Sequence, residues 1–580
     1  MPGAPDRSCL GPARRARDLD RLAREQFDVV VVGGGVTGTG AALDAASRGL
    51  SVAVVEARDW AGGTSSRSSK LIHGGLRYLE QLDLPLVREA LRERGRQLST
   101  IAPHLVVPQP FLLPLTAPMW QRGYYGAGVL LYDLLASLGG GAGVPVHRHL
   151  SKRQTLRSFP GLRADGLHGA IRYFDAQVDD ARHTLALART AAAYGAAVLS
   201  STRVVELLDA GGAVAGVRAR CLETGAEIDV RARAVVAATG VWSDDVGVML
   251  SGARSARGGP AMGLRVRASK GVHLVVGRDR IDGAAGLILR TPTSVLFVIP
   301  WGAHWIVGTT DTDWNLDRAH PAASSADIDY LLAQVNRVLA RPLERADIQG
   351  VYAGLRPLLA GESDATSRLS REHAVVTPAP GLTIVAGGKY TTYRVMAEDA
   401  VDVATAAWSG VPASRTARLP LVGAPGYAAA WSDRGLLAER YEVPRATVER
   451  LLGRYGDRTN ELLELMAADP EWSRPLPGAP EHVAAEVRYA ATHEGALHAD
   501  DVLARRTRIS VQTTHRGLDT VERVAELMAD VLAWSATTVA RELEHYRARV
   551  AAELESQQMP DDRTADAARL GAPDVRTATA

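Results

Sequence analysis

The chain has 580 residues, of which 46% are hydrophobic, and its 67 basic and 65 acidic side chains leave a formal net charge of +2. This composition can bury a large core, which excludes a chain disordered throughout, and the balanced charge gives no electrostatic reason to expect a nucleic-acid-binding protein. Two cysteines, Cys9 and Cys221, cannot build a disulfide framework or a zinc site, so we expect neither.

The first 26 residues form a polar segment with six arginines. No apolar stretch of the roughly 7–15 residues that a secretory signal needs follows them. We therefore expect a flexible extension over residues 1–26, with an arginine-rich targeting peptide as the alternative. No run of about 18 apolar residues occurs, so the sequence predicts no membrane-spanning helix.

Residues 27–56 have the pattern of one strand–helix–strand unit. The β-branched apolar run at 27–32 is typical of a strand buried on both faces of a parallel sheet. A glycine-rich turn follows, then a helix-favouring segment at 41–48 and a second apolar run at 51–55. These elements predict a Rossmann-like nucleotide-binding unit.

The turn carries Gly33, Gly35 and Gly38 in a G-x-G-x-x-G pattern. The first glycine permits the tight turn, the second lets the backbone approach a pyrophosphate, and the third allows close helix–strand packing. The helix that follows offers free N–H groups to phosphates. Glu56 stands 21 residues after Gly35, where a carboxylate accepts hydrogen bonds from a ribose diol. The unit therefore predicts a dinucleotide site, for FAD or for NAD.

Two further glycine clusters favour FAD over NAD. Thr239 and Gly240 follow a buried apolar run. They belong either to the flavin site or to a plain turn at the end of a strand. Gly387 and Gly388 follow another apolar run at residues 382–386. This second cluster resembles the segment that reaches the flavin ring in two-domain flavoproteins.

The segment at residues 62–80 closely resembles the corresponding part of the FAD-dependent glycerol-3-phosphate dehydrogenases. It reads GGTSSRSSKLIHGGLRYLE. Residues 488–508 resemble the C-terminal domain of the longer family members. Further segments match the family in the same order, between about residue 27 and residue 410: 270–273, 299–301, 308–311, 354–358, 370–373 and 388–394.

The resemblance implies an α/β fold with a Rossmann-like FAD-binding domain of the two-domain flavoprotein type, an inserted antiparallel β substrate domain and a C-terminal helical domain. We expect the discontinuous FAD-binding domain at residues 27–100, 165–250 and 355–415, the substrate domain at 101–164 and 251–354, and the helical domain at 427–555. The small, polar residues at 556–580 predict a disordered tail.

The resemblance also implies FAD, bound without a covalent link. The hydroxyls and backbone N–H groups of residues 62–69 suit the pyrophosphate and ribityl chain of that cofactor. The expected cofactor-binding residues are Gly33, Gly35, Gly38, Glu56, Thr64, Ser65, Ser66, Ser68, Val205, Thr239, Gly240, Gly387, Gly388, Lys389 and Thr391.

A cationic cradle for the phosphate of glycerol 3-phosphate is a further implication of the family. Arginine offers a bidentate fork that matches phosphate oxygens, and lysine adds a point charge. The expected substrate-binding residues are Arg77, Tyr78, Thr310, Arg356, Arg371 and Lys389.

Oxidation of the C2 alcohol requires hydride loss to the flavin and removal of the hydroxyl proton. A base with a pKa near neutrality suits the second task, which indicates histidine. His73 and His273 are both candidates, and the sequence does not separate them. We expect these histidines, with Arg356 and Lys389, to form the catalytic group.

The resemblance therefore implies oxidation of sn-glycerol 3-phosphate to dihydroxyacetone phosphate. Family members pass the electrons to a membrane quinone, which implies a cytoplasmic enzyme placed peripherally on the inner face of a membrane. An oxidase that uses oxygen is the nearest alternative. A non-catalytic flavin-binding regulatory protein is the alternative from another class, and it would have no reason to keep the histidines and cations together. The oligomeric state, including a homodimer, stays open.

Overall fold

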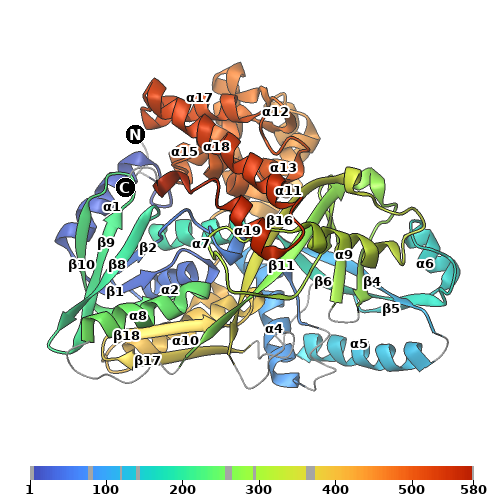
Figure 1. Ribbon diagram of the computed structural model, residues 1–580, viewed down its shortest axis with the longest axis horizontal. Coiled ribbons are helices and arrows are strands. Elements are labelled where there is room, and N and C mark those ends of the chain that lie inside the picture. The colour runs from blue at the N-terminus through green and yellow to red at the C-terminus, as the bar shows by residue number, and fades with distance from the viewer. Residues whose placement is uncertain are drawn as a thin grey trace.

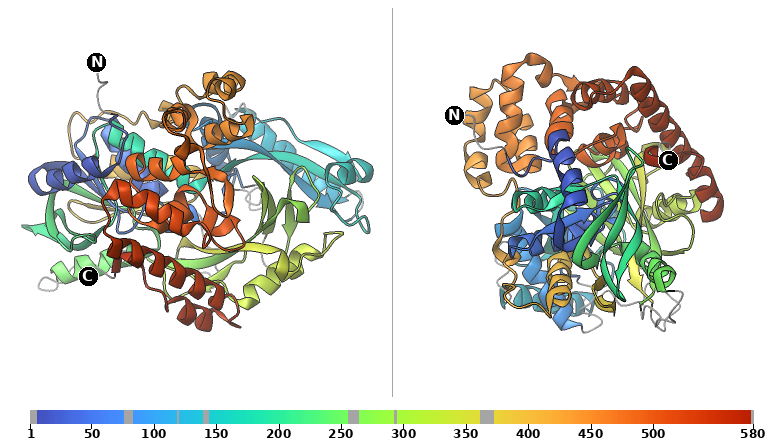
Figure 2. Two further views of the ribbon diagram at one scale, coloured as in Figure 1. Left: turned by 90° about the horizontal axis from the view of Figure 1, so that it is seen from above. Right: turned by 90° about the vertical axis from the view of Figure 1, so that its left-hand side faces the viewer.

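The computed structural model describes residues 6–75, 83–117, 120–138, 144–254, 264–291, 295–360 and 372–577. Two large β-sheets lie next to each other, and a helical module lies across both of them (Figure 1). The turned views in Figure 2 show the same module covering one side of the molecule.

The first sheet has eight strands in the order β17-β18-β10-β1-β2-β7, and β9 and β8 continue from β10 as an antiparallel extension. Its central pairings are parallel, and Val29, Val30 and Val31 are fully buried, as expected for a strand covered on both faces. The strands are β1 (Gln26–Val32), β2 (Val52–Val55), β7 (Ala197–Leu199), β8 (Thr202–Ala210), β9 (Ala213–Cys221), β10 (Glu227–Ala237), β17 (His373–Ala379) and β18 (Leu382–Gly387).

Helices cover both faces of this sheet. Val29 and Val31 face a core shared with α2 (Val36–Ser47), α7 (Asp180–Ala193) and α10 (Tyr393–Thr405). Val30 faces the opposite core, to which α1 (Pro12–Arg24) and α8 (Ser243–Arg254) contribute. The alternation along β1 therefore sets the two helical layers.

The second sheet has ten strands and is antiparallel except where β12 pairs with β4. Four helices lie around it: α4 (Leu84–Arg96), α5 (Trp120–Leu138), α6 (Lys152–Ser158) and α9 (Ser325–Asn336). The strands are β3 (Leu71–Ile72), β4 (Val106–Leu115), β5 (Arg148–Ser151), β6 (Gly169–Val178), β11 (Val266–Gly277), β12 (Gly286–Arg290), β13 (Val295–Trp301), β14 (His304–Gly308), β15 (Thr312–Trp314) and β16 (Ile348–Leu359).

The second sheet takes in strands from beyond the expected domain boundaries, among them β3 from residues 27–100, which pairs with β6. The sequence placed residues 165–250 in the FAD-binding domain, but β6 pairs with β4 over residues 169–178 and belongs to the second sheet. Ala170 and Ile171 point to opposite faces of this sheet and are fully buried in two different cores, so β6 is covered on both faces there. β16 crosses the other boundary, at residue 355, because it stays paired with β11 along its length.

The C-terminal module is built from helices around two apolar cores. A short β-hairpin, β19 (Pro475–Leu476) with β20 (Ala479–Val483), interrupts it. The helices are α11 (Tyr427–Ser432), α12 (Arg434–Arg440), α13 (Arg445–Tyr455), α14 (Thr459–Ala468), α15 (Ala484–His493), α16 (Ile509–Gln512), α17 (Val521–Leu532), α18 (Ala536–Ser556) and α19 (Asp562–Arg569).

Both chain ends differ from the flexible segments that the sequence predicted. Within residues 6–26, α1 buries Leu22 completely, and Arg14 pairs with Asp18 at 2.6 Å. In the tail, α19 continues the module, and Arg576 pairs with Asp501 at 2.9 Å. The expectation of disorder over these residues is wrong because the polar side chains form buried ion pairs, which a composition rule cannot see.

A buried histidine joins the helical module to the first sheet. Both ring nitrogens of His498 contact a carboxylate: Nδ1 lies 2.9 Å from Glu542, and Nε2 lies 3.0 Å from Glu223 in the β9–β10 connection. Burial opposes the imidazolium, but the two carboxylates outweigh it and raise the pKa of His498 to about 9. The ion cluster therefore holds the two units together at neutral pH.

The elevated pKa predicts that stability falls with rising pH. The stabilisation from His498 is fully present below the unfolded-state pKa of about 6.5 and is lost as the pH passes 9, a contribution of roughly 3 kcal/mol at most. We expect the unfolding temperature of the parent to fall between pH 7 and pH 9.5 by more than that of H498Q. Parallel pH slopes for the two proteins in thermal melts would contradict the assignment.

Candidate active site

The β1–α2 turn accepts only glycine at two of its three marked positions. Gly33 has a φ of +114°, and a Cβ there would lie 2.6 Å from the carbonyl oxygen of Ala238. A Cβ on Gly38 would lie 1.9 Å from the carbonyl oxygen of Gly33, so Gly38 brings the helix against the turn. Gly35 precedes the first residue of α2 and leaves the backbone open toward a cavity.

Glu56 directly follows β2 and bonds to this turn. Its Oε2 accepts a hydrogen bond from the backbone N–H of Gly34 at 2.6 Å, and its Oε1 accepts one from Arg58 at 2.8 Å. The carboxylate also lines the cavity, where the sequence placed it for a ribose. The motif alone does not predict this hydrogen bond between Glu56 and the turn.

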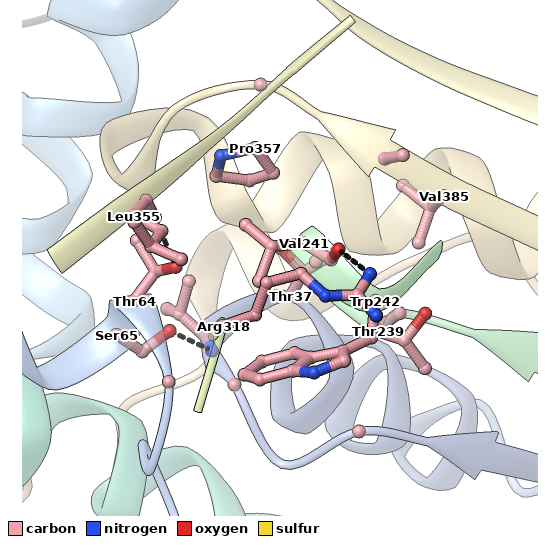
Figure 3. Close-up of a pocket in the computed structure, with 18 of the residues that line it drawn as sticks. Thr37, Thr64, Ser65, Thr239, Val241, Trp242, Arg318, Leu355, Pro357 and Val385 are labelled. Carbon is pink, nitrogen blue, oxygen red and sulfur yellow. Dashed lines mark hydrogen bonds between the residues drawn. The ribbon is translucent and has the colours of Figure 1, made fainter. Parts of the chain in front are cut away.

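A cavity of about 670 Å³ runs from this turn to the second sheet. Figure 3 shows Thr64, Ser65, Trp242 and Arg318 around it. Twelve of the fifteen expected cofactor residues line it: Gly33, Gly35, Glu56, Thr64, Ser65, Ser68, Thr239, Gly240, Gly387, Gly388, Lys389 and Thr391.

Three expected cofactor residues lie outside the cavity lining. Gly38 packs behind Gly33, as described above. Ser66 is buried, and its carbonyl oxygen accepts a hydrogen bond from Arg508 at 3.1 Å. Val205 does not line the cavity, whereas Thr202, Arg203 and Val204 at the start of β8 do. For Ser66 and Val205 the cofactor contact stays a prediction, and neighbouring residues of the same segments line the cavity.

Residues 64–70 are held in place by bonds to distant parts of the chain. Ser65 Oγ accepts the first free N–H of α2, from Val36, at 2.9 Å, and Thr64 Oγ1 donates to the carbonyl oxygen of Leu355 at 2.6 Å (Figure 3). Ser68 and Lys70 both bond to the carboxylate of Asp180, at 2.7 and 2.9 Å. The segment is therefore fixed to α7 and to β16 as well as to α2.

The two candidate histidines both line the far end of the cavity, in different surroundings. His273 on β11 is buried, lies 2.8 Å from Ser69 Oγ through Nε2, and stacks on Tyr352 with ring centroids 4.7 Å apart. Burial, with Arg356 nearby, holds the pKa of His273 well below its usual value. His73 follows β3, and its backbone N–H donates to Thr391 Oγ1 at 3.1 Å.

Arg356 reaches the cavity from β16 and is oriented by the β14–β15 connection. It donates to Thr309 Oγ1 at 3.0 Å and to the carbonyl oxygen of Thr310 at 3.2 Å, and it lies 3.6 Å from Asp311. A Cβ on Gly271 would lie 2.6 Å from this guanidinium, so the glycine leaves the space that it occupies.

Thr310 bonds within the second sheet. Its Oγ1 accepts a hydrogen bond from the backbone N–H of Val272 at 3.0 Å, and its side chain is absent from the residues that line the cavity. Its backbone carbonyl accepts from Arg356, and a substrate contact of Thr310 stays a prediction. Lys389 lines the cavity. Arg77, Tyr78 and Arg371 lie outside the described residues.

Several residues of the site carried no signal in the sequence. Arg318 reaches in from the segment before α9, donates to the carbonyl oxygen of Val241 at 3.0 Å and pairs with Asp245 at 2.9 Å (Figure 3). Behind the cavity, Arg508 of the helical module pairs with Asp179 at 3.0 Å and with Asp180, the carboxylate that also holds Ser68 and Lys70.

The family comparisons agree with this geometry. The FAD-dependent oxidoreductase family matches residues 28–394, and the C-terminal domain of alpha-glycerophosphate oxidase matches residues 414–539. Glycerol-3-phosphate dehydrogenase 2 of Mycobacterium tuberculosis is 56% identical, over 98% of this chain and 96% of that protein. The human mitochondrial glycerol-3-phosphate dehydrogenase is 38% identical, over 90% of this chain and 73% of that protein.

A solved structure shares the whole architecture. The glycerol-3-phosphate dehydrogenase from Bacillus halodurans complexed with FAD superposes with a TM-score of 0.75 at 27% identity, over 93% of this chain and 98% of that chain. The glycine cradle of the β1–α2 turn, which a Cβ would fill, and the hydroxyl-lined cavity beyond it fit an FAD cofactor. The chain belongs to the family of FAD-dependent glycerol-3-phosphate dehydrogenases.

Proposed function

We propose that this protein oxidises sn-glycerol 3-phosphate to dihydroxyacetone phosphate and passes the electrons through FAD to a membrane quinone. One observation carries the substrate assignment: a single cavity joins the β1–α2 turn to Arg356, Lys389, His73 and His273. The names of the relatives support the same substrate. When bound, FAD supplies the acceptor for the hydride from C2.

The cations at the far end of the cavity suit a phosphate dianion. Arg356 is already oriented by Thr309 and Thr310, so its fork loses little freedom when an anion arrives. Lys389 follows Gly387 and Gly388, whose φ angles are +77° and +75°. This tight turn brings the lysine to the cavity, and we propose that the two cations hold the substrate phosphate.

We assign the proton-accepting role to His73. A general base works best when its pKa lies near the working pH, and the strongly lowered pKa of His273 makes its ring a weak base. His273 is also fixed by Ser69 and by the Tyr352 ring. We therefore propose that His73 accepts the C2 hydroxyl proton and that His273 shapes the wall of the site.

The outer face of α5 supports attachment to a membrane. Among the described residues, no helix is long and apolar enough to cross a bilayer. On α5, however, Trp120, Tyr124, Leu130 and Leu134 are all more than half exposed and share one stripe of the helix. An exposed apolar stripe with aromatic residues suits the interfacial region of a bilayer. The helix also lies at the edge of the molecule away from the helical module (Figure 1).

The α5 assignment predicts lost membrane binding when the stripe is charged. We expect the double variant L130E/L134E to remain in the supernatant when sedimented with phospholipid vesicles, while the parent pellets. Leu436 on α12 is equally exposed, so L436E is the matched control and should pellet like the parent. Turnover with a soluble dye acceptor should be the same in all three proteins. Equal sedimentation of the double variant and the parent would contradict the assignment.

Steady-state turnover tests the choice of electron acceptor. With glycerol 3-phosphate as substrate, we expect a water-soluble quinone analogue to raise turnover at least tenfold over air-saturated buffer alone. Hydrogen peroxide should account for a small fraction of the electrons when quinone is present. Full turnover with oxygen, one peroxide per substrate and no stimulation by quinone would establish the oxidase alternative instead.

A further inference from the structure

A second, smaller cavity lies where the first sheet, the second sheet and the helical module meet. Its volume is about 50 Å³, several times the ~10–15 Å³ that a cavity needs to hold one water molecule. Arg58 and Arg67 enter it from the β2–β3 connection, and His320 enters from the segment before α9. Arg549 on α18 and Arg569 on α19 close it from the helical module.

Two of these arginines have no carboxylate partner among the described residues. Arg58 and Arg67 both donate to the same carbonyl oxygen, that of Ala319, at 2.8 and 3.1 Å. Two guanidinium groups on one oxygen lie close enough to repel each other. Burial together with Arg58 and other nearby arginines lowers the pKa of Arg67 to about 9.

Among the other cations of the cavity, Arg569 is only partly balanced, because it lies 3.8 Å from Glu553 and shares that carboxylate with Arg549 at 3.0 Å. Arg549 also pairs with Asp500, and Arg505 and Arg576 have carboxylate partners of their own. His320 carries no charge at neutral pH, since burial beside Arg569 and Arg58 holds its pKa well below the usual value. Its Nδ1 lies 3.3 Å from Arg569, which is itself buried. An enclosed excess of positive charge is costly unless an anion compensates it.

We propose that this cavity is a binding site for a phosphate-type oxyanion, held by the guanidinium groups of Arg67 and Arg569. Guanidinium forks match the oxygens of a phosphate, and the two arginines come from different units of the fold. The anion would therefore tie the helical module to the FAD-binding sheet. The small volume favours free phosphate over the phosphoryl group of a larger molecule. The proposal does not depend on the substrate or acceptor of the large cavity.

Binding of inorganic phosphate to the FAD-loaded holoenzyme tests the site. Thermal unfolding is followed against phosphate concentration, with sodium chloride holding the ionic strength constant. We expect phosphate to raise the unfolding temperature of the parent, and R569Q to weaken the apparent affinity by roughly tenfold or more, as for a lost charged hydrogen bond. Arg547 on the same module pairs with Glu522 outside the cavity, so R547Q is the matched control and should respond like the parent.

A third variant separates this cavity from the proposed substrate cradle. R356Q removes a cradle cation and should keep the thermal response to phosphate. A response that survives in R569Q, disappears in R356Q, or is absent from the parent would overturn the proposal. Arg58 and Arg67 also line the large cavity, where they could serve the cofactor instead. If R569Q lost its FAD, the charges of Arg58 and Arg67 would be assigned to cofactor binding, and the phosphate proposal would be overturned.

Removal of a carboxylate gives a test of opposite sign that does not rely on R569Q folding. Asp574 lines the cavity, and D574N should tighten phosphate binding severalfold; unchanged or weaker binding would contradict the proposal. Phenyl phosphate distinguishes the two sources of the ligand. Binding at least tenfold weaker than that of phosphate assigns the site to the free anion, whereas equal binding assigns it to the phosphoryl end of a larger molecule.

Discussion

The variant R356A should lose most of its efficiency toward glycerol 3-phosphate, with kcat/KM reduced by an amount equivalent to about 2–5 kcal/mol. The guanidinium lies in the cavity with its fork oriented by Thr309 and Thr310, so its removal leaves a buried phosphate without its partner. FAD content should stay near normal, because the glycine turn and residues 64–70 surround the other end of the cavity.

Three comparisons make this result specific. R356K should recover only part of the efficiency, since lysine keeps the charge and loses the fork. Discrimination against plain glycerol should shrink, because glycerol has no phosphate to hold. Arg345 lies on the surface of the same unit and pairs with Asp329, so R345A should behave like the parent in steady-state kinetics. Parent-like kcat/KM in R356A with full FAD content would place the phosphate elsewhere. The corresponding role of Arg371 stays a prediction.

The variant H73N should reduce kcat by roughly 10²- to 10⁴-fold, the usual contribution of a general base. The acidic limb of the pH profile of kcat/KM should disappear in the same variant, because asparagine cannot accept the hydroxyl proton. The flavin absorption spectrum should show that FAD is still bound.

H273N serves as the contrasting variant for the base. Its imidazole is held neutral by burial and by Arg356, and it bonds to Ser69, so its loss should disturb geometry and leave the pH limb in place. Pre-steady-state flavin bleaching at several pH values measures the chemical step directly. If the acidic limb survives in H73N and vanishes in H273N, the two roles are reversed.

The local sequence determined the nucleotide-binding unit of this protein. The β-branched run before Gly33, the glycine spacing and Glu56 act within about thirty residues, and local sterics alone require glycine where φ is +114°. The same holds for the glycine pair at 387–388, where φ is +77° and +75°. The segment at 62–80 carried the family resemblance, and the family comparisons confirmed both the family and FAD.

The tertiary structure decided everything that depends on partners distant in the chain. α1 is held by distant backbone groups: Arg14 donates to the carbonyl oxygen of Ala196 at 2.5 Å, and Asp18 accepts the N–H of Val198 at 3.0 Å. Beyond α19, Arg576 pairs with Asp501, and no local pattern predicts such contacts. Strand pairing, not motif membership, sets which side chains line the cavity: Val204 lines it and Val205 does not, and Thr310 bonds to Val272. The different surroundings of the two histidines depend on how the two sheets pack. The placement of Arg58 and Arg67 without a carboxylate partner arises where three units of the fold meet, and residue spacing in the sequence does not predict it.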